Sequence, residues 1–131
     1  MAEEISKGLK ILLILEFIVA NIYGITYLFF TEQYIALVAW PFDDPIVGRM
    51  LGVSLMTYGL CSLIAFLRKD WKTARIVIEL QIFWHILGLG VVIIGSIVLN
   101  LIEDMWIFIV ILAPFLVAFI YFYIAEQKRF S

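Results

Sequence analysis

The sequence predicts an all-α integral membrane protein that forms a four-helix bundle. Hydrophobic residues make up 65% of the 131-residue chain, charged residues make up 15%, and the mean hydropathy is +1.10. A soluble domain is ordinarily about half apolar and about a quarter charged. The apolar residues also form four long runs, and a helix of about 20 such residues crosses a bilayer. We therefore expect a single domain, residues 1–131, with four spans.

The first expected helix covers residues 9–30 and contains an acidic residue, Glu16. Ala20 and Gly24 follow on the same face, because residues four apart in a helix lie one above the other, and Asn21 lies on a neighbouring face. Ala20 and Gly24 form a small-x-x-x-small pair, which lets the backbone of another helix approach closely. The acidic face is therefore also the expected contact face.

The connection from residue 31 to residue 47 is the longest in the chain. Its apolar part, residues 34–40, is too short to cross a bilayer. We expect instead a short segment that lies in the membrane interface, with Trp40 at the level of the lipid headgroups.

The second expected helix covers residues 46–67. Asp44 followed by Pro45 is typical of an N-cap with proline in the first helical turn. Small residues recur along one face of this helix, which indicates a second surface for close packing. These residues are Gly48, Gly52 and Gly59.

The third expected helix, residues 74–99, carries more polar groups than a lipid-facing helix tolerates. Glu79 shares a face with Arg75, which favours pairing between these two side chains near the membrane surface. At about 100° per residue, a different face carries the only histidine of the chain together with an amide and small residues. That stripe contains Gln81, His85, Gly88, Val92 and Gly95, and we expect its two glycines to be positions of helix packing.

A tight turn leads into the fourth expected helix, residues 105–125, where Pro114 removes one backbone donor. Orientation follows from the basic residues, because cytoplasmic loops are enriched in lysine and arginine. Eight of the nine lie near the N-terminus, in the loop between the second and third helices, or near the C-terminus. The sequence thus predicts that both termini are cytoplasmic, in a plasma or cytoplasmic membrane. The eight are Lys7, Lys10, Arg68, Lys69, Lys72, Arg75, Lys128 and Arg129.

The predicted topology places Glu16, Tyr58 and His85 at depths that allow them to converge, given a rise of about 1.5 Å per residue. Glu16 is costly inside a bilayer and requires a partner, a proton or water. One interpretation is a site that binds protons or cations. The alternative is a carboxyl group that fastens two helices together.

The other polar residues of the spans have structural interpretations of the same kind. A neutral His85 bonded to another helix is favoured over a reactive one, and Gln81 has a similar structural interpretation. The candidates for a ligand or proton site are therefore Glu16, Asn21, Tyr58, Glu79, Gln81, Trp84 and His85.

Several function classes are excluded or not indicated. The net charge of −2 gives no reason to expect a nucleic-acid partner. One histidine and one cysteine provide neither a bis-histidine haem site nor a zinc or iron–sulfur ligand set, so we expect no metal and no cofactor. No nucleophile–base set is visible, although Cys61, Ser62 and Tyr58 could join His85. We therefore assign no catalytic residue, and an enzyme is not indicated.

Two families resemble parts of the chain. Asp44-Pro45, Arg49-x-Leu51-Gly52 and Gly59 are similar to the corresponding stretch of DoxX-like small four-helix membrane proteins. Some members of that family are membrane subunits associated with redox enzymes, so this resemblance implies an accessory role.

Four short spans with Glu16 in the first, and a tryptophan shortly before glycines in the third, resemble small multidrug-resistance transporters. That resemblance implies a coupling acid at Glu16 and a substrate-stacking ring at Trp84.

The glycine faces, the dispersed polar residues and the absence of a catalytic set favour a non-catalytic accessory or interaction subunit. Its expected partners are the lipid bilayer and either a second copy of the chain or a larger membrane complex. One alternative is a proton-coupled small-molecule carrier that uses Glu16. Another is a redox or lipid-modifying membrane enzyme, which requires a quinone or lipid pocket that reaches His85.

Overall fold

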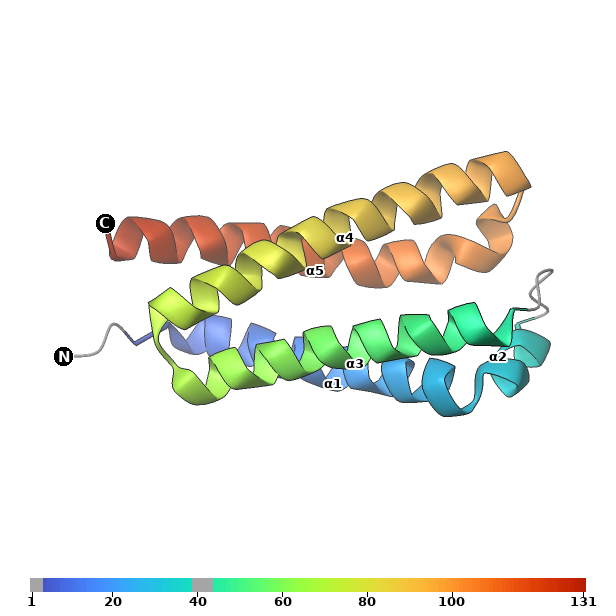
Figure 1. Cartoon of the computed structure of the whole chain (residues 1–131). Coiled ribbons are helices and arrows are strands. Elements are labelled where there is room, and N and C mark those ends of the chain that lie inside the picture. Colours follow the sequence, from blue (N-terminus) through green and yellow to red (C-terminus); the bar gives the residue numbers. More distant parts are fainter. Residues whose placement is uncertain (1–3, 39–43) are drawn as a thin grey trace.

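The computed structural model describes residues 4–38 and 44–131, and these residues are almost entirely helical (Figure 1). Four of the helices are long and apolar enough to cross a membrane, which confirms the predicted all-α class and the four predicted runs. In chain order the helices are α1 (Lys7–Phe29), α2 (Thr31–Leu37), α3 (Pro45–Arg68), α4 (Trp71–Leu99) and α5 (Ile102–Arg129).

Three of the four predicted long helices agree with the structure to within three residues at each end. The fourth is longer than predicted, because it begins at Ile102 instead of residue 105 and ends at Arg129 instead of residue 125. The turn before this helix is short. Asn100 ends α4 in a left-handed conformation (φ 56°), and α5 begins two residues later, at Ile102. Glu103 lies in the first turn of this helix, where backbone N–H groups favour negative charge.

The segment between α1 and α3 is partly helical. α2 is held to α3 by an ion pair between Glu32 and Arg49, with 2.6 Å between Oε1 and Nη2. The Arg49 guanidinium, which donates a hydrogen bond, holds the pKa of Glu32 below its ordinary value. Trp40, for which we expected a place among the headgroups, lies outside the described residues.

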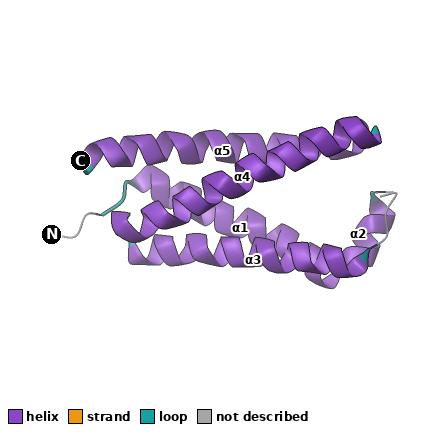
Figure 2. Ribbon diagram, turned by 45° about the horizontal axis from the view of Figure 1, so that its top comes forward, coloured by secondary structure: helices purple, strands orange, loops and turns teal. Residues whose placement is uncertain are grey.

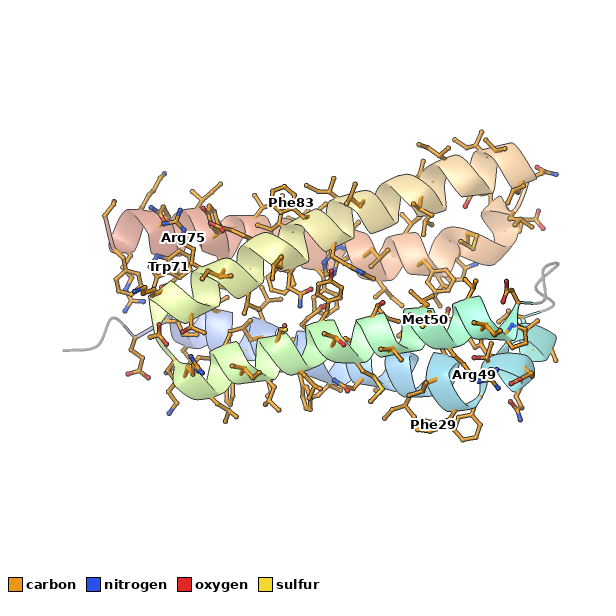
Figure 3. All side chains as sticks on the ribbon, in the orientation of Figure 1. Phe29, Arg49, Met50, Trp71, Arg75 and Phe83 are labelled. Atoms are coloured by element: carbon orange, nitrogen blue, oxygen red, sulfur yellow. The ribbon has the colours of Figure 1, made fainter. Side chains whose placement is uncertain are left out.

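The long helices form two pairs, α1 with α3 and α4 with α5, which run side by side (Figures 1 and 2). The pairs meet closely near the two termini, which lie at the same end of the molecule, and are farther apart at the end that carries α2. We call these the terminal end and the α2 end. Large side chains such as Phe29 and Phe83 point away from the bundle, as expected for contact with lipid (Figure 3).

Small residues bring α1 and α3 into backbone contact. A Cβ atom added to Gly52 would lie 2.6 Å from the Leu28 nitrogen and 2.7 Å from the Gly24 oxygen. A Cβ atom at Gly59 would lie 3.2 Å from the Cβ of Ala20, and one at Gly48 would meet the side chain of Thr31. The predicted contact faces on the first and second helices are therefore confirmed, and they pack against each other.

The predicted packing role of the α4 glycines is not confirmed in the same way. The nearest atoms to a Cβ added to Gly88 are Leu112 Cδ1 at 3.8 Å and Trp84 Cζ3 at 3.9 Å, so this contact is loose. No atom of the described residues lies within 4 Å of a Cβ atom added to Gly95, so Gly95 makes no close contact there and its packing role stays a prediction. The reason is that α4 has left the α1–α3 pair at this level and has only α5 beside it (Figure 1).

The hydrophobic core lies in the half of the bundle nearest the terminal end, where the pairs meet. Leu9, Leu13, Ile78 and Phe119 are fully buried there. Backbone contacts close this end, since the Ile5 N–H donates to the Lys69 oxygen at 2.8 Å.

The carboxylate of Glu126 completes this closure and is 2% exposed. It accepts hydrogen bonds from the Ser6 N–H at 3.2 Å and from Arg129 at 3.0 Å. Arg129 also donates to the Glu4 carbonyl at 3.0 Å. The N-terminal segment is therefore fastened to the end of α5.

Asp70 caps α4 at the terminal end, where its carboxylate accepts a hydrogen bond of 2.8 Å from the Thr73 N–H. That bond lowers the pKa of Asp70. We expect Asp70→Ala to lower the free energy of unfolding by about 1 kcal/mol at neutral pH. Because the folded-state pKa is lowered, the contribution is full above the ordinary pKa of aspartate and is lost as pH falls through the lowered value. Denaturant unfolding of both proteins at neutral and acidic pH checks this, and a difference that does not shrink in acid would contradict it.

Candidate functional site

A cluster of buried polar side chains lies where the two helix pairs meet. It comprises Glu16 of α1, Ser62 of α3, and Gln81 and His85 of α4, and we call it the polar core. None of the four is more than 5% exposed. In a membrane span such groups need partners, since lipid offers none. The polar core is therefore the main polar contact between α4 and the α1–α3 pair.

Gln81 joins α4 to α3. Its Nε2 donates to the Tyr58 carbonyl and to the Ser62 Oγ, both at 3.0 Å. Its Oε1 is buried and accepts no hydrogen bond within the described part of the chain. Both hydrogen bonds that the Gln81 amide donates therefore run from α4 to α3 and hold these two helices together.

The geometry of His85 fixes which ring nitrogen carries hydrogen. Nδ1 lies 2.7 Å from the Gln81 carbonyl oxygen, which is only an acceptor, so Nδ1 must be the donor. Nε2 faces Glu16 Oε2 at 3.8 Å, which is too long for a hydrogen bond. One proton placed on either the carboxylate or Nε2 makes the pair neutral overall. A small approach of α1 toward α4 would therefore create a charge-assisted hydrogen bond.

Aromatic rings enclose the imidazole of His85. The centroids of Trp84, Phe119 and Phe115 lie 5.2, 5.6 and 6.1 Å from that of His85. Trp84 also packs against the ring of Tyr58, with 5.6 Å between centroids. His85 is 1% exposed, so its imidazole is enclosed by the side chains around it.

The structure brings several of the predicted site residues together. Glu16 and His85 converge as the predicted depths allow, with Gln81 and Trp84 beside them. Tyr58 contributes its backbone carbonyl to Gln81, and its ring packs on Trp84. The sequence left open whether these residues meet, and their roles stay predictions.

Two predicted site residues lie apart from the polar core. Asn21 donates to the Phe17 carbonyl of its own helix at 2.8 Å and packs against Gly59. Glu79 accepts hydrogen bonds from Arg75 and from the Tyr123 hydroxyl, both at 2.9 Å, which confirms its pairing with Arg75.

Two side chains outside the candidate set take part in the buried polar contacts. Ser62 receives a hydrogen bond from Gln81, whereas the sequence suggested only that it could join His85. Glu126 was missed, although an acid followed three residues later by Arg129 on an apolar helix is a recognisable signal. The bond between Gln81 and Ser62 becomes apparent only when the helix order is known, because the two residues lie on different helices.

In residues 4–38 and 44–131 no group of three or more His, Cys, Asp or Glu side chains is arranged to hold a metal ion. Comparison of the chain with protein-family models, curated proteins and solved structures finds no match. The two family resemblances therefore stay predictions, and the functional argument rests on the geometry.

Proposed function

We propose that the protein is a non-catalytic subunit of a membrane complex, in which the α4–α5 pair binds another membrane-spanning chain. The observation that carries the proposal is how little α4 and α5 bury within this chain. Only 11% and 6% of their apolar windows are buried, against 28% for α1 and 22% for α3. The α4–α5 pair therefore has most of its surface free for lipid or for a partner.

The free surface of α4 includes bare backbone at Gly90 and Gly95, where no described atom lies within 4 Å of an added Cβ atom. Glycines in membrane helices allow a partner helix to approach the backbone closely. This exposed glycine backbone is suited to contact with a helix of a larger subunit or of a second copy of this chain.

The proposal includes the orientation of the chain. Both termini lie at one end (Figure 1), where eight of the nine basic residues are also placed by the sequence. By the positive-inside rule this end faces the cytoplasm. Arg49, the remaining basic residue, lies at the α2 end.

We expect Gly95→Leu to leave the isolated chain folded, because the added side chain meets open space, and to reduce co-purification of the partner at least tenfold. The measurement is a mild detergent extraction of native membranes with a tagged chain, followed by quantitative mass spectrometry of stoichiometric proteins. Val98→Leu, at a position that is 74% exposed on the same helix, serves as the control.

Two results would contradict the proposal. One is a wild-type chain that elutes as a monomer with no stoichiometric protein. The other is a partner that is retained equally by the Gly95 and Val98 variants.

A second candidate function is proton-coupled transport of a small molecule. It is favoured by Glu16, which is 5% exposed and accepts no hydrogen bond within the described residues. A carboxyl group in such surroundings, with His85 beside it, is suited to taking up and releasing a proton.

Transport and assembly are distinguished by Glu16→Gln, which keeps the shape of the side chain and removes its charge. The carrier hypothesis predicts that this variant folds, assembles and does not transport in proteoliposomes under a pH gradient. Wild-type transport by the variant would eliminate the carrier.

A further inference from the structure

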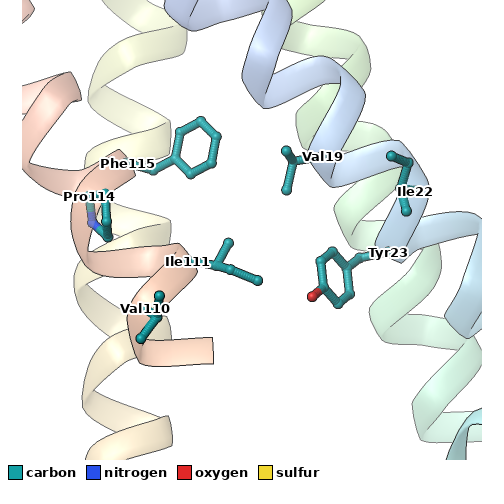
Figure 4. A pocket seen from close by; sticks show the side chains of 7 residues that line it. All are labelled: Val19, Ile22, Tyr23, Val110, Ile111, Pro114 and Phe115. Carbon is teal, nitrogen blue, oxygen red and sulfur yellow. The ribbon is translucent and has the colours of Figure 1, made fainter. Parts of the chain in front are cut away.

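A cavity of about 310 Å³ lies between α1 and α5, on the α2 side of the polar core (Figure 4). α1 contributes Val19, Ile22 and Tyr23 to its wall. The facing residues of α5 are Val110, Ile111, Pro114 and Phe115. The two helix pairs diverge toward the α2 end (Figure 1), and on that side of the cavity α5 still contacts α1 through Phe108, whose ring centroid lies 6.3 Å from that of Tyr23.

The lining residues define the chemistry of an occupant. None of them is charged, and nearly all of the wall is hydrocarbon, so the occupant is neutral and mainly apolar. The volume is at the lower end of the range of about 300–1,000 Å³ for ligand pockets. One hydrocarbon chain or a small ring system has this size and polarity.

Two polar groups lie at the wall. The Tyr23 hydroxyl points into the space between the helices and makes no hydrogen bond to the described residues (Figure 4). Opposite it, Pro114 has no N–H, so the Val110 carbonyl lacks its usual helical donor. Tyr23 and Val110 both line the cavity, which lies in the apolar part of the spans, where a donor or an acceptor without a partner is costly.

We propose that this cavity binds a neutral lipid-like molecule that has an apolar body and one hydroxyl group. The hydroxyl accepts a hydrogen bond from Tyr23 and donates one to the Val110 carbonyl, while the body packs between α1 and α5. The proposal does not rest on the assembly role of the α4–α5 pair, because the lining residues all belong to α1 and α5 of this chain.

The occupant touches the polar core through one side chain. Phe115 lines the cavity, and its ring centroid lies 6.1 Å from that of His85. Glu16 lies one turn before Val19 on α1. A bound molecule would thus rest against the residues that separate the cavity from the Glu16–His85 pair.

The test uses the full-length chain in phosphatidylcholine vesicles and a diazirine derivative of hexadecanol as probe. After illumination, the labelled positions are mapped by mass spectrometry. We expect labelling at the lining residues of α1 and α5 to exceed that at Ile18, which is 46% exposed on α1 outside the cavity, by at least fivefold. Unlabelled hexadecanol is expected to remove the excess.

Three variants sharpen the result. Ile111→Trp fills the cavity and is expected to lower specific labelling at least tenfold, whereas Ile18→Trp is the matched control and is expected to leave it unchanged. Tyr23→Phe removes one oxygen atom without a change of shape, and we expect binding to weaken about threefold to tenfold.

The proposal is overturned if labelling is uniform over all lipid-facing positions, or if Ile111→Trp and Ile18→Trp behave alike. It is also overturned if the lining is protected from the probe while the protein migrates as a dimer, because a second copy would then occupy the cavity. Unchanged binding by Tyr23→Phe would eliminate the hydroxyl contact.

Discussion

Replacing Gly52 by leucine is expected to separate α1 from α3 and to lower the free energy of unfolding by about 3 kcal/mol, in the upper part of the range for overpacked sites. The reason is the nature of the nearest atoms. A Cβ atom at Gly52 meets the Leu28 nitrogen at 2.6 Å and the Gly24 oxygen at 2.7 Å, and both are backbone atoms of α1. A backbone cannot rotate away, so the helix itself has to move.

The measurement is reversible unfolding in mixed detergent micelles, followed by circular dichroism. Gly95→Leu is the matched control, since its added side chain meets no described atom and the residue is a better helix former than glycine. We expect the control to be unchanged or stabilised by up to about 1 kcal/mol. Equal losses for the two variants would show that the α1–α3 contact is not as close as described.

The second large effect is expected at the polar core. His85→Leu leaves the Glu16 carboxyl buried without its neighbour, and we expect a loss of about 3 kcal/mol in the free energy of unfolding. The double variant Glu16→Leu, His85→Leu has no orphaned group and is expected to recover much of this loss. The interaction energy from the double-mutant cycle is expected to be about 2 kcal/mol.

The exposed pair Arg75 and Glu79 provides the control cycle. Its atoms are closer, at 2.9 Å against 3.8 Å for Glu16 and His85, yet it lies at the surface. We therefore expect an interaction of only about 0.3–0.5 kcal/mol. If the buried pair has no larger interaction than the exposed pair, the polar core does not fasten the helix pairs together.

The helices could be predicted because their signals are local. Each signal lies within one turn or one span of the sequence. These signals are the four apolar runs, the Asp44–Pro45 start of α3 and the small residues of α1 and α3. The packing roles of Gly24 and Gly52 could be predicted without knowledge of helix order, since close packing requires small residues on both partners. The end of α5 was missed because Glu126 is held by the distant Ser6.

The candidate site could be predicted only in part, because its geometry depends on which helices are neighbours. The depth of Glu16 and His85 follows from counting residues, and their contact is consistent with it. Glu79 and Arg75 could be paired because they lie one turn apart on one helix. The outward position of Gly95 could not be predicted, since the divergence of the helix pairs is a property of the whole bundle.

We propose that the polar core is a sealed contact between α1, α3 and α4, since its four side chains are at most 5% exposed. His85 is the only histidine of the chain, so its imidazole signals in ¹⁵N solid-state NMR need no assignment. We expect a protonated Nδ1 bonded to the Gln81 carbonyl, with an N–H signal that persists for hours after vesicles are transferred to D₂O. A hydrogen on Nε2 alone, or an Nδ1–H signal lost in the first spectrum, would contradict it.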